Sequence, residues 1–112
     1  MVHADGWPGI DPARWSWLGL LAGLALVDAL TRICGLAARL KWPNDVLVPT
    51  PAGPDGSPPG LRKVCGVLSE VVVAGDAASD GFDPDTAAAV IGAGINVSQS
   101  PEELPVDTAT SL

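Results

Sequence analysis

Residues 38–48 read ARLKWPNDVLV, and this stretch decides the fold that the sequence predicts. Strand-forming residues flank Pro43 on both sides, which favours a β-strand that is interrupted at the proline. A central strand excludes proline, because proline has no N–H group to donate to the sheet. We therefore expect a bulge or a turn at Pro43, with Asn44 and Asp45 in it.

Two stretches further along the chain are also rich in strand-forming residues, namely 61–74 (LRKVCGVLSEVVVA) and 88–98 (AAVIGAGINVS). The intervening segment 49–60 (PTPAGPDGSPPG) has five prolines and three glycines, which predicts a mobile surface loop without regular structure. Residues 75–87 predict an acidic turn. Strands that follow one another without helices favour antiparallel pairing.

Upstream of these strands, the sequence predicts one helix over 12–34. Asp11 can cap the free N–H groups of the first turn, and Pro12 suits the first helical position. Gly35 suits the left-handed residue that ends a helix. Apolar residues recur at helical spacing at Trp15, Leu18, Ala22, Ala25, Ala29 and Ile33. With residues 1–10 as a loose leader, we expect an α+β fold of one helix followed by three strands.

Composition limits both the size of the fold and its partners. The chain has 112 residues, of which 47% are apolar, so it can form one domain with a packed core. Six Lys and Arg against thirteen Asp and Glu give a net charge of −7, which excludes a general nucleic-acid binder and argues against binding to anionic membranes. The longest apolar run is Trp17–Val27, well short of the roughly 20 residues of a membrane-spanning helix. We therefore expect a helix that is buried on most of its faces.

The cysteines and the histidine argue against a metal site. Cys34 and Cys65 lie far apart in the sequence, no Cys-x-x-Cys pair occurs, and His3 is the only histidine. This pattern argues against a zinc site and against a Cys/His nucleophile. Both thiols are expected to be reduced, as in a cytosolic protein.

Two pairs of polar residues point to chemistry, and each has a structural alternative. Lys41 and Lys63 are the only lysines and adjoin apolar stretches, where a lysine is costly to bury unless it meets an anion. Alternatively, their stems line strand edges while their ammonium groups stay in water. Asn44 and Asp45 are held at a fixed angle after the proline, or they are a common turn pair.

The third and fourth features lie within predicted strands. Glu70 stands in a run of strand-forming residues, either for function or simply as a solvent-facing residue. Gly92 and Gly94 end an apolar strand, where a ligand or another backbone can approach closely. They are not part of a dinucleotide fingerprint, because Val97 stands where its third glycine would be and no helix is predicted to follow.

Taken in order, three motifs resemble those of the biotin protein ligases, which biotinylate acetyl-CoA carboxylase and related carboxylases. They are KWPNDVL at 41–47, KVCGVLSE at 63–70 and VIGAGINV at 90–97. The preceding helix and the closing ATSL at 109–112 fit as well, so the resemblance covers residues 11–112. It implies a fold like the catalytic core of class II aminoacyl-tRNA synthetases, a mixed and mostly antiparallel sheet with flanking helix.

The sequence also departs from the family pattern. Members carry an upstream Gly/Arg-rich loop that closes over the adenylate, upstream polar residues that bind the ureido ring of biotin, and a small C-terminal SH3-like domain, and none of these is seen. We therefore expect 11–112 to be the central part of a catalytic domain, truncated at both ends and inactive alone. Loop 49–60 resembles an insertion, which is tolerable because loop-closure entropy grows slowly with length.

The resemblance implies a two-step reaction. Biotin carboxylate attacks the α-phosphate of ATP to give biotinyl-5′-AMP and pyrophosphate, and the adenylate then acylates a lysine of a biotin carboxyl carrier domain. Lys63 is implied to contact the biotin carboxyl group and the phosphate, and Gly66 to let biotin approach. Asp45 is implied to hold Mg²⁺ or to orient the lysine. The residues implied to bind ATP or the adenylate are Lys41, Asn44, Gly92, Gly94 and Asn96, with Lys41 also able to balance Asp45.

Further expectations follow from the same resemblance. They are ATP, Mg²⁺ and biotin as reaction partners without a tightly bound cofactor, a cytoplasmic location, no contact with nucleic acid or membrane through this region, and room for a homodimer of the full enzyme. Two alternatives stay open. One is a lipoate-type ligase of the same fold, against which the KWPND motif argues, and the other is a non-catalytic fragment that binds biotin or its adenylate.

Overall fold

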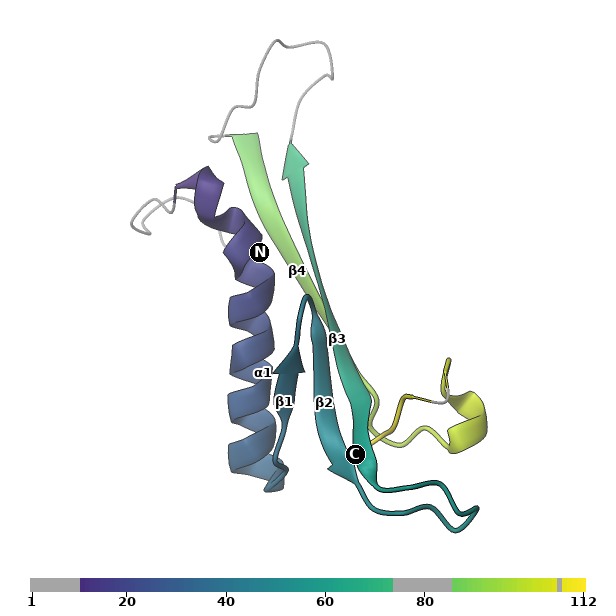
Figure 1. The fold of residues 1–112 in the computed structure, drawn as a ribbon. Helices are drawn as coiled ribbons and strands as arrows, with labels where there is room; N and C mark the ends of the chain where they lie inside the picture. The colour runs from purple at the N-terminus through teal and green to yellow at the C-terminus, as the bar shows by residue number, and fades with distance from the viewer. Residues whose placement is uncertain (1–10, 74–85, 107) are drawn as a thin grey trace.

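The computed structural model describes residues 11–73, 86–106 and 108–112, and it has an α+β fold (Figure 1). One helix packs against a four-stranded antiparallel sheet with the strand order β1-β2-β3-β4. The elements are η1 (Pro12–Trp17), α1 (Leu18–Cys34), β1 (Arg39–Lys41), β2 (Asp45–Thr50), β3 (Gly60–Val73), β4 (Ala87–Ile95) and η3 (Pro101–Glu103). The predicted leader 1–10 and nearly all of the predicted acidic turn lie outside the described residues.

The helical segment begins and ends where the sequence predicts. The Asp11 side chain accepts a hydrogen bond from the Ala13 N–H group at 3.0 Å, and Pro12 takes the first helical position. Gly35 ends α1 in the left-handed conformation, with φ of 67°. The first six residues form a 3-10 helix, η1, so the segment is α-helical only from Leu18 onward.

The stretch 38–48 forms two strands, and the prediction of three strands was therefore wrong by one. The chain turns at Trp42–Asn44, so β1 folds back on β2 with Arg39 opposite Leu47 and Lys41 opposite Asp45. The Trp42–Pro43 peptide bond is cis. Since Pro43 cannot donate to a sheet, the chain reverses direction there, and the predicted turn is confirmed.

The loop between β2 and β3 is shorter and more ordered than predicted. Pro49 pairs with Leu61 and Thr50 with Gly60, so regular pairing extends into both ends of segment 49–60. Within the loop, the Gly53 N–H group donates to the Ser57 carbonyl at 2.9 Å. Pro49 is tolerated because β1 pairs only with the first half of β2, which leaves a free edge beside the proline.

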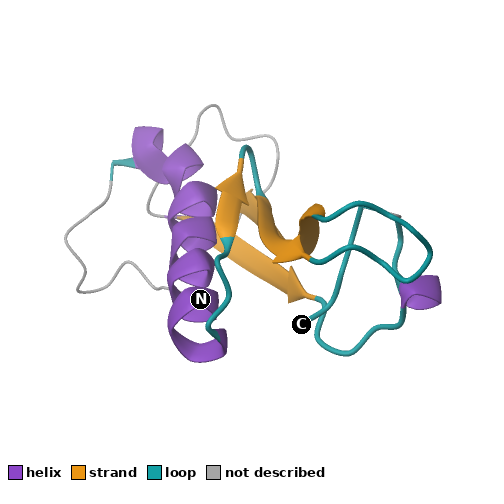
Figure 2. Cartoon of the chain, turned by 60° about the horizontal axis from the view of Figure 1, so that its bottom comes forward, coloured by secondary structure: helices purple, strands orange, loops and turns teal. Residues whose placement is uncertain are grey.

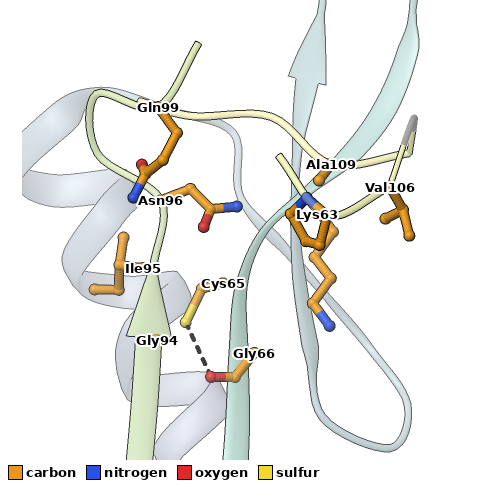
Figure 3. A pocket seen from close by; sticks show the side chains of 10 residues that line it. Lys63, Cys65, Gly66, Gly94, Ile95, Asn96, Gln99, Val106 and Ala109 are labelled. Carbon is orange, nitrogen blue, oxygen red and sulfur yellow. Dashed lines mark hydrogen bonds between the residues drawn. The ribbon is translucent and has the colours of Figure 1, made fainter. Parts of the chain in front are cut away.

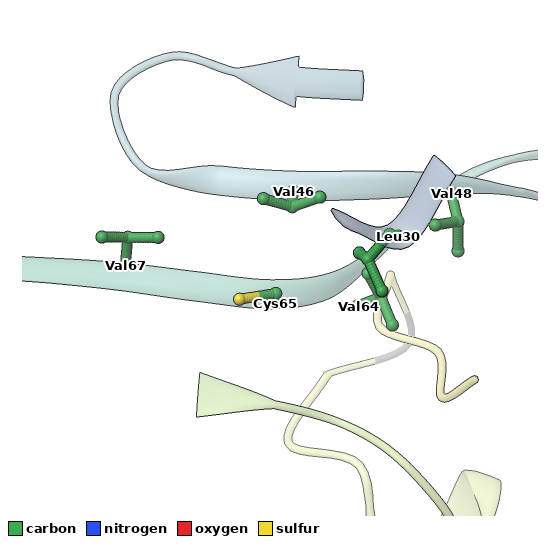
Figure 4. Close-up of a cluster of buried hydrophobic side chains, with 6 residues drawn as sticks. All are labelled: Leu30, Val46, Val48, Val64, Cys65 and Val67. Atoms are coloured by element: carbon green, nitrogen blue, oxygen red, sulfur yellow. The ribbon is translucent and has the colours of Figure 1, made fainter. Parts of the chain in front are cut away.

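The core lies between α1 and one face of the sheet (Figures 1 and 2). Gly23 allows the close approach of α1 to β1, since a Cβ atom there would come within 2.6 Å of Leu40 Cδ1. The buried cluster, drawn in Figure 4, consists of Leu30, Val46, Val48, Val64, Cys65 and Val67. The opposite face of the sheet carries no helix among the described residues, and we call it the open face.

Helix α1 is not buried on most of its faces, contrary to the prediction. Only Gly23 and Leu30 are buried, whereas apolar side chains such as Trp17 (62% exposed) and Ile33 (83% exposed) face outward. By length and composition, Pro12–Cys34 could span a membrane, a criterion that signal sequences and core helices of soluble proteins also meet. Here the inner side of the helix packs on the sheet.

Candidate active site

Four of the predicted site residues form one row across the sheet. Lys41 pairs with Asp45, Asp45 with Gly66, and Gly66 with Gly94, so the row crosses all four strands. Residues directly opposite each other in antiparallel strands have side-chain positions on the same face. The buried residue Val46 lies under α1, so its neighbour Asp45, and with it the whole row, belongs to the open face.

A bulge in β3 brings Lys63 to this face. Val46 pairs with Cys65 but Leu47 pairs with Lys63, so Val64 has no partner on β2. In an uninterrupted ladder, Lys63 would oppose Val48 and would point into the core. The extra residue instead places Val64 in the core, with 0% of it exposed, and turns Lys63 toward Asp45.

Lys63 and Asp45 form an ion pair above Gly66. The Lys63 Nζ atom lies 2.6 Å from Asp45 Oδ1, and the two side chains are 39% and 23% exposed. A Cβ atom on Gly66 would lie 3.3 Å from both Cε and Nζ of Lys63, so glycine leaves room for the lysine stem. This geometry agrees with the expectation that Asp45 orients the lysine.

The ion pair borders a cleft of about 560 Å³, a volume typical of small-molecule sites (Figure 3). The cleft is lined by Lys63, Cys65, Gly66, Gly94, Ile95, Asn96, Gln99, Pro105, Val106 and Ala109. Sequence reasoning missed the contribution of 99–106. The only available signal in this part of the chain was the ATSL segment, which includes Ala109.

Asn96 lies at the junction of the cleft and the sheet. Its backbone N–H group donates to the Val64 carbonyl at 2.8 Å, and its side-chain Nδ2 donates to the Thr110 carbonyl at 3.0 Å. The amide nitrogen that was expected to serve a nucleotide is therefore used within the protein.

The remaining predicted residues lie outside the cleft lining. Gly92 opposes Leu68 farther along β4, and Asn44 lies in the turn, where its carbonyl accepts from the Val67 N–H group. Glu70 is exposed on β3, in agreement with the solvent-facing alternative. Lys41 is exposed opposite Asp45, but the ion pair found for Asp45 among the described residues is with Lys63, so the expected balance by Lys41 is not seen.

Cys65 is a packing residue with a neutral thiol. Burial raises the pKa of its thiol, and the opposing effect of the Lys63 ammonium group is smaller. A thiol that stays protonated at neutral pH is a poor nucleophile. Cys65 therefore supplies part of the apolar core and of the cleft wall.

The donor set suits a metal ion only if a ligand brings most of the coordination. Among the described residues, no group of three His, Cys, Asp or Glu side chains could hold a metal. Asp45 offers one carboxylate beside the cleft. Mg²⁺ is often bound by one or two carboxylates together with substrate phosphates, so Asp45 fits a Mg²⁺ ion that arrives with a nucleotide.

A lysine held by a carboxylate over glycine, beside a cleft of this volume, defines a site for a small anionic ligand. Comparison with known proteins makes the class specific. The chain is 37% identical to the biotin–[acetyl-CoA-carboxylase] ligase of Mycobacterium tuberculosis over 101 residues, which are 88% of this chain and 29% of the relative. It is 40% identical to the ligase of the same name from Paracoccus denitrificans over 87 residues, 76% of this chain and 28% of the relative.

A further relative is the bifunctional ligase/repressor BirA of Bacillus subtilis, which is 32% identical over 108 residues, 94% of this chain and 27% of the relative. No family model and no solved structure matches the chain. The chain thus spans less than a third of the length of each of these curated relatives. It is homologous to a segment of the biotin protein ligases, and the resemblance inferred from its motifs is confirmed.

Proposed function

We propose that this chain is part of a biotin protein ligase and carries the lysine that binds the reacting carboxylate and phosphate. The parent enzyme converts biotin and ATP to biotinyl-5′-AMP and pyrophosphate, then transfers biotin to a lysine of a carrier domain. The observation that supports this most directly is the Lys63–Asp45 ion pair at the edge of the cleft, in a chain whose relatives are named biotin ligases.

The chemistry requires a fixed cation. Carboxylate and α-phosphate are both anionic, and they must meet before the anhydride forms, so positive charge lowers the barrier by reducing their repulsion. In a closed site, one such group typically contributes roughly 10²–10³ in rate. In this proposal Lys63 supplies the charge, and Asp45 holds it in place until the substrates arrive.

The other roles follow from position. Gly66 and Gly94 let biotin and the adenylate lie close to the sheet, because neither presents a side chain to the open face. Asn96 contributes from the end of β4. The residues proposed to contact ATP from outside the cleft lining are Lys41, Asn44 and Gly92, with Mg²⁺ brought by the phosphates and met by Asp45.

The proposal extends to the whole protein. Residues 11–112 correspond to a partial catalytic domain of the class II synthetase-like type, with 49–60 as an inserted loop. The partner is the biotin carboxyl carrier domain of acetyl-CoA carboxylase or a related carboxylase, the enzyme is cytoplasmic, and the full enzyme has room to form a homodimer. The names of the relatives favour biotin over lipoate. Because the chain spans so little of each relative, we expect it to bind biotin or its adenylate rather than to turn over alone.

The test uses a chimaera in which this chain replaces the matched segment of the Mycobacterium tuberculosis ligase. Lys63→Ala should lower biotin-dependent pyrophosphate release by roughly 10²-fold or more, because the fixed cation is lost. The matched control is Arg32→Ala, which removes a cation from the outer surface of α1.

Three outcomes would contradict the proposal. Near-normal pyrophosphate release by Lys63→Ala would remove Lys63 from the reaction. Release that is driven by lipoate rather than biotin would change the substrate. Calorimetry that detects no binding of biotin to the 112-residue chain, alone or with ATP, would contradict a binding role for the chain itself.

A further inference from the structure

The segment Thr108–Leu112 runs beside β3 at Lys63, where β4 has already ended. The Lys63 N–H group donates to the Thr108 carbonyl at 2.8 Å, and the Thr110 N–H group donates to the Lys63 carbonyl at 2.7 Å. Lys63 and Ala109 form a parallel bridge. Both backbone polar groups of Lys63 are therefore bonded to this segment, which we call the 108–112 clamp.

Asn96 fixes the clamp in position. Its side-chain Nδ2 donates to the Thr110 carbonyl at 3.0 Å, and its own carbonyl accepts from the Leu112 N–H group at 3.1 Å. Its backbone N–H group donates to the Val64 carbonyl at 2.8 Å. Asn96 thus connects the clamp to the bulge residue of β3 through three hydrogen bonds, and Figure 3 shows it between the end of β4 and Lys63.

The bonds to the clamp and to Asn96 are those that a bulge at Val64 requires. The carbonyls of Lys63 and Val64 are consecutive, yet Lys63 bonds to the clamp and Val64 to Asn96, and neither bond goes to β2. In a regular strand, consecutive carbonyls point to opposite sides. Holding both of them away from β2 preserves the extra residue and so the face on which the Lys63 side chain lies.

From this geometry we infer that Asn96 and the 108–112 clamp are positioning elements for Lys63. Without the clamp, the β3 backbone at Lys63 has a free edge, and the register can slip by one residue so that Lys63 opposes Val48. That slip moves the ammonium group to the core face and breaks its ion pair with Asp45. The inference deepens the proposed function, since it concerns the same lysine, but its structural content stands without any assumption about the ligand.

The test is nuclear magnetic resonance of the full 112-residue chain, with no ligand present. In the unmodified chain, the Lys63 amide should exchange with solvent at least 10-fold more slowly than exposed loop amides, and Lys63 Hε should show a nuclear Overhauser effect to Gly66 Hα. Asn96→Asp replaces the Nδ2 donor by an oxygen that repels the Thr110 carbonyl. We expect it to weaken the Overhauser effect several-fold and to accelerate Lys63 exchange about 10-fold or more.

A matched control separates positioning from loss of stability. Thr50→Val removes another side-chain hydrogen bond between β2 and β3, the one from Thr50 Oγ1 to the Gly60 carbonyl, and should leave both signals unchanged. If Asn96→Asp retains the Overhauser effect and the slow exchange, the inference is overturned. If Asn96→Asp does not fold, the unmodified chain decides, because an unprotected Lys63 amide or an absent Overhauser effect overturns the inference there.

The functional consequence has its own readout. In a folded Asn96→Asp chain, biotin affinity measured by calorimetry should fall in proportion to the loss of the Overhauser effect. Loss of the NMR signals without any change in biotin affinity would leave the positioning role intact and would count against the proposed function of Lys63.

Discussion

The ion pair between Lys63 and Asp45 is exposed enough that it contributes little to folding. Partly exposed pairs of this kind contribute about 0–1 kcal/mol to stability, because water already solvates both charges. A carboxylate beside the reacting lysine is thus better explained by the need to orient the lysine than by stability. This makes Asp45 separable from the fold in experiments.

Asp45→Asn should impair catalysis more than biotin binding. In the chimaera, we expect Mg²⁺-dependent pyrophosphate release to fall by about 10²-fold, since the amide neither attracts the metal nor holds the lysine. The free energy of unfolding should change by less than about 1 kcal/mol. The measurement is a Mg²⁺ titration of pyrophosphate release, with Asp28→Asn on α1 as the control. Superimposable titrations of Asp45→Asn and the parent would remove Asp45 from metal binding.

The two thiols should differ sharply in reactivity. Cys34 is exposed, whereas Cys65 is buried with a raised pKa. At pH 8 a thiol reagent should modify Cys34 quickly and Cys65 only after denaturant is added. Fast labelling of two thiols in the folded chain would contradict the burial of Cys65.

The raised pKa of Cys65 also predicts a pH dependence of stability. Above the ordinary thiol pKa of about 8.5, the unfolded chain releases this proton while the folded chain retains it, so the unfolded state binds fewer protons and the free energy of unfolding falls as pH rises. Urea unfolding at pH 7 and pH 10 should show the decrease, and Cys65→Ala should reduce it. An equal decrease in both chains would assign it to other groups.

At the scale of elements, the bulge in β3 and the loop before it have different importance. The bulge decides which residues face the cleft, whereas the loop over 51–59 is closed by the pair Thr50 and Gly60 and makes its hydrogen bonds internally or with neighbouring residues. A connection of this kind can be shortened without disturbing the strands that it joins.

Replacing 51–59 by Asn-Gly should preserve the fold. The pair Thr50 and Gly60 would then close a two-residue hairpin turn, for which Asn-Gly is the preferred sequence. Because a shorter loop loses less entropy on closure, the free energy of unfolding should rise by about 1 kcal/mol. Urea unfolding measures this, and a Gly-Ser loop of the original length is the control. A large loss of carrier biotinylation in the chimaera, with the fold intact, would show that the loop contacts the carrier domain.

At the scale of the whole molecule, the chain exposes more surface than a domain of its size normally does. Its accessible surface is 8142 Å², against about 5700 Å² expected for a compact monomer of the same mass. The radius of gyration is 17.8 Å, against about 13 Å expected for this length. The outer side of α1 and the edge strand β4 account for much of the exposed apolar surface.

The isolated chain should therefore associate and should not biotinylate a carrier domain. Exposed apolar side chains and an unpaired strand edge both promote association. Size-exclusion chromatography should show oligomers or aggregates, and Leu21→Lys combined with Leu24→Lys should reduce them, because it charges the outer side of α1. A monomer that unfolds cooperatively and transfers biotin would contradict both expectations.

The local sequence was sufficient for several features of this protein. Asp11, Pro12 and Gly35 set the limits of the helical segment, because capping depends on residues next to each other in the chain. Pro43 set the reversal between β1 and β2 for the same reason. The motifs KWPNDVL, KVCGVLSE and VIGAGINV also sufficed for the resemblance to biotin protein ligases.

The orientation of Lys63 depends on the tertiary structure. In a strand read from sequence alone, Lys63 and Cys65 share one face and Gly66 lies on the other, which would separate the lysine from the glycine beneath it. The bulge at Val64 reverses this assignment, and its hydrogen-bond partners come from Asn96 and Thr110, more than thirty residues away along the chain. Which face a side chain occupies is set by such pairing, and no local pattern in 61–74 contains that information.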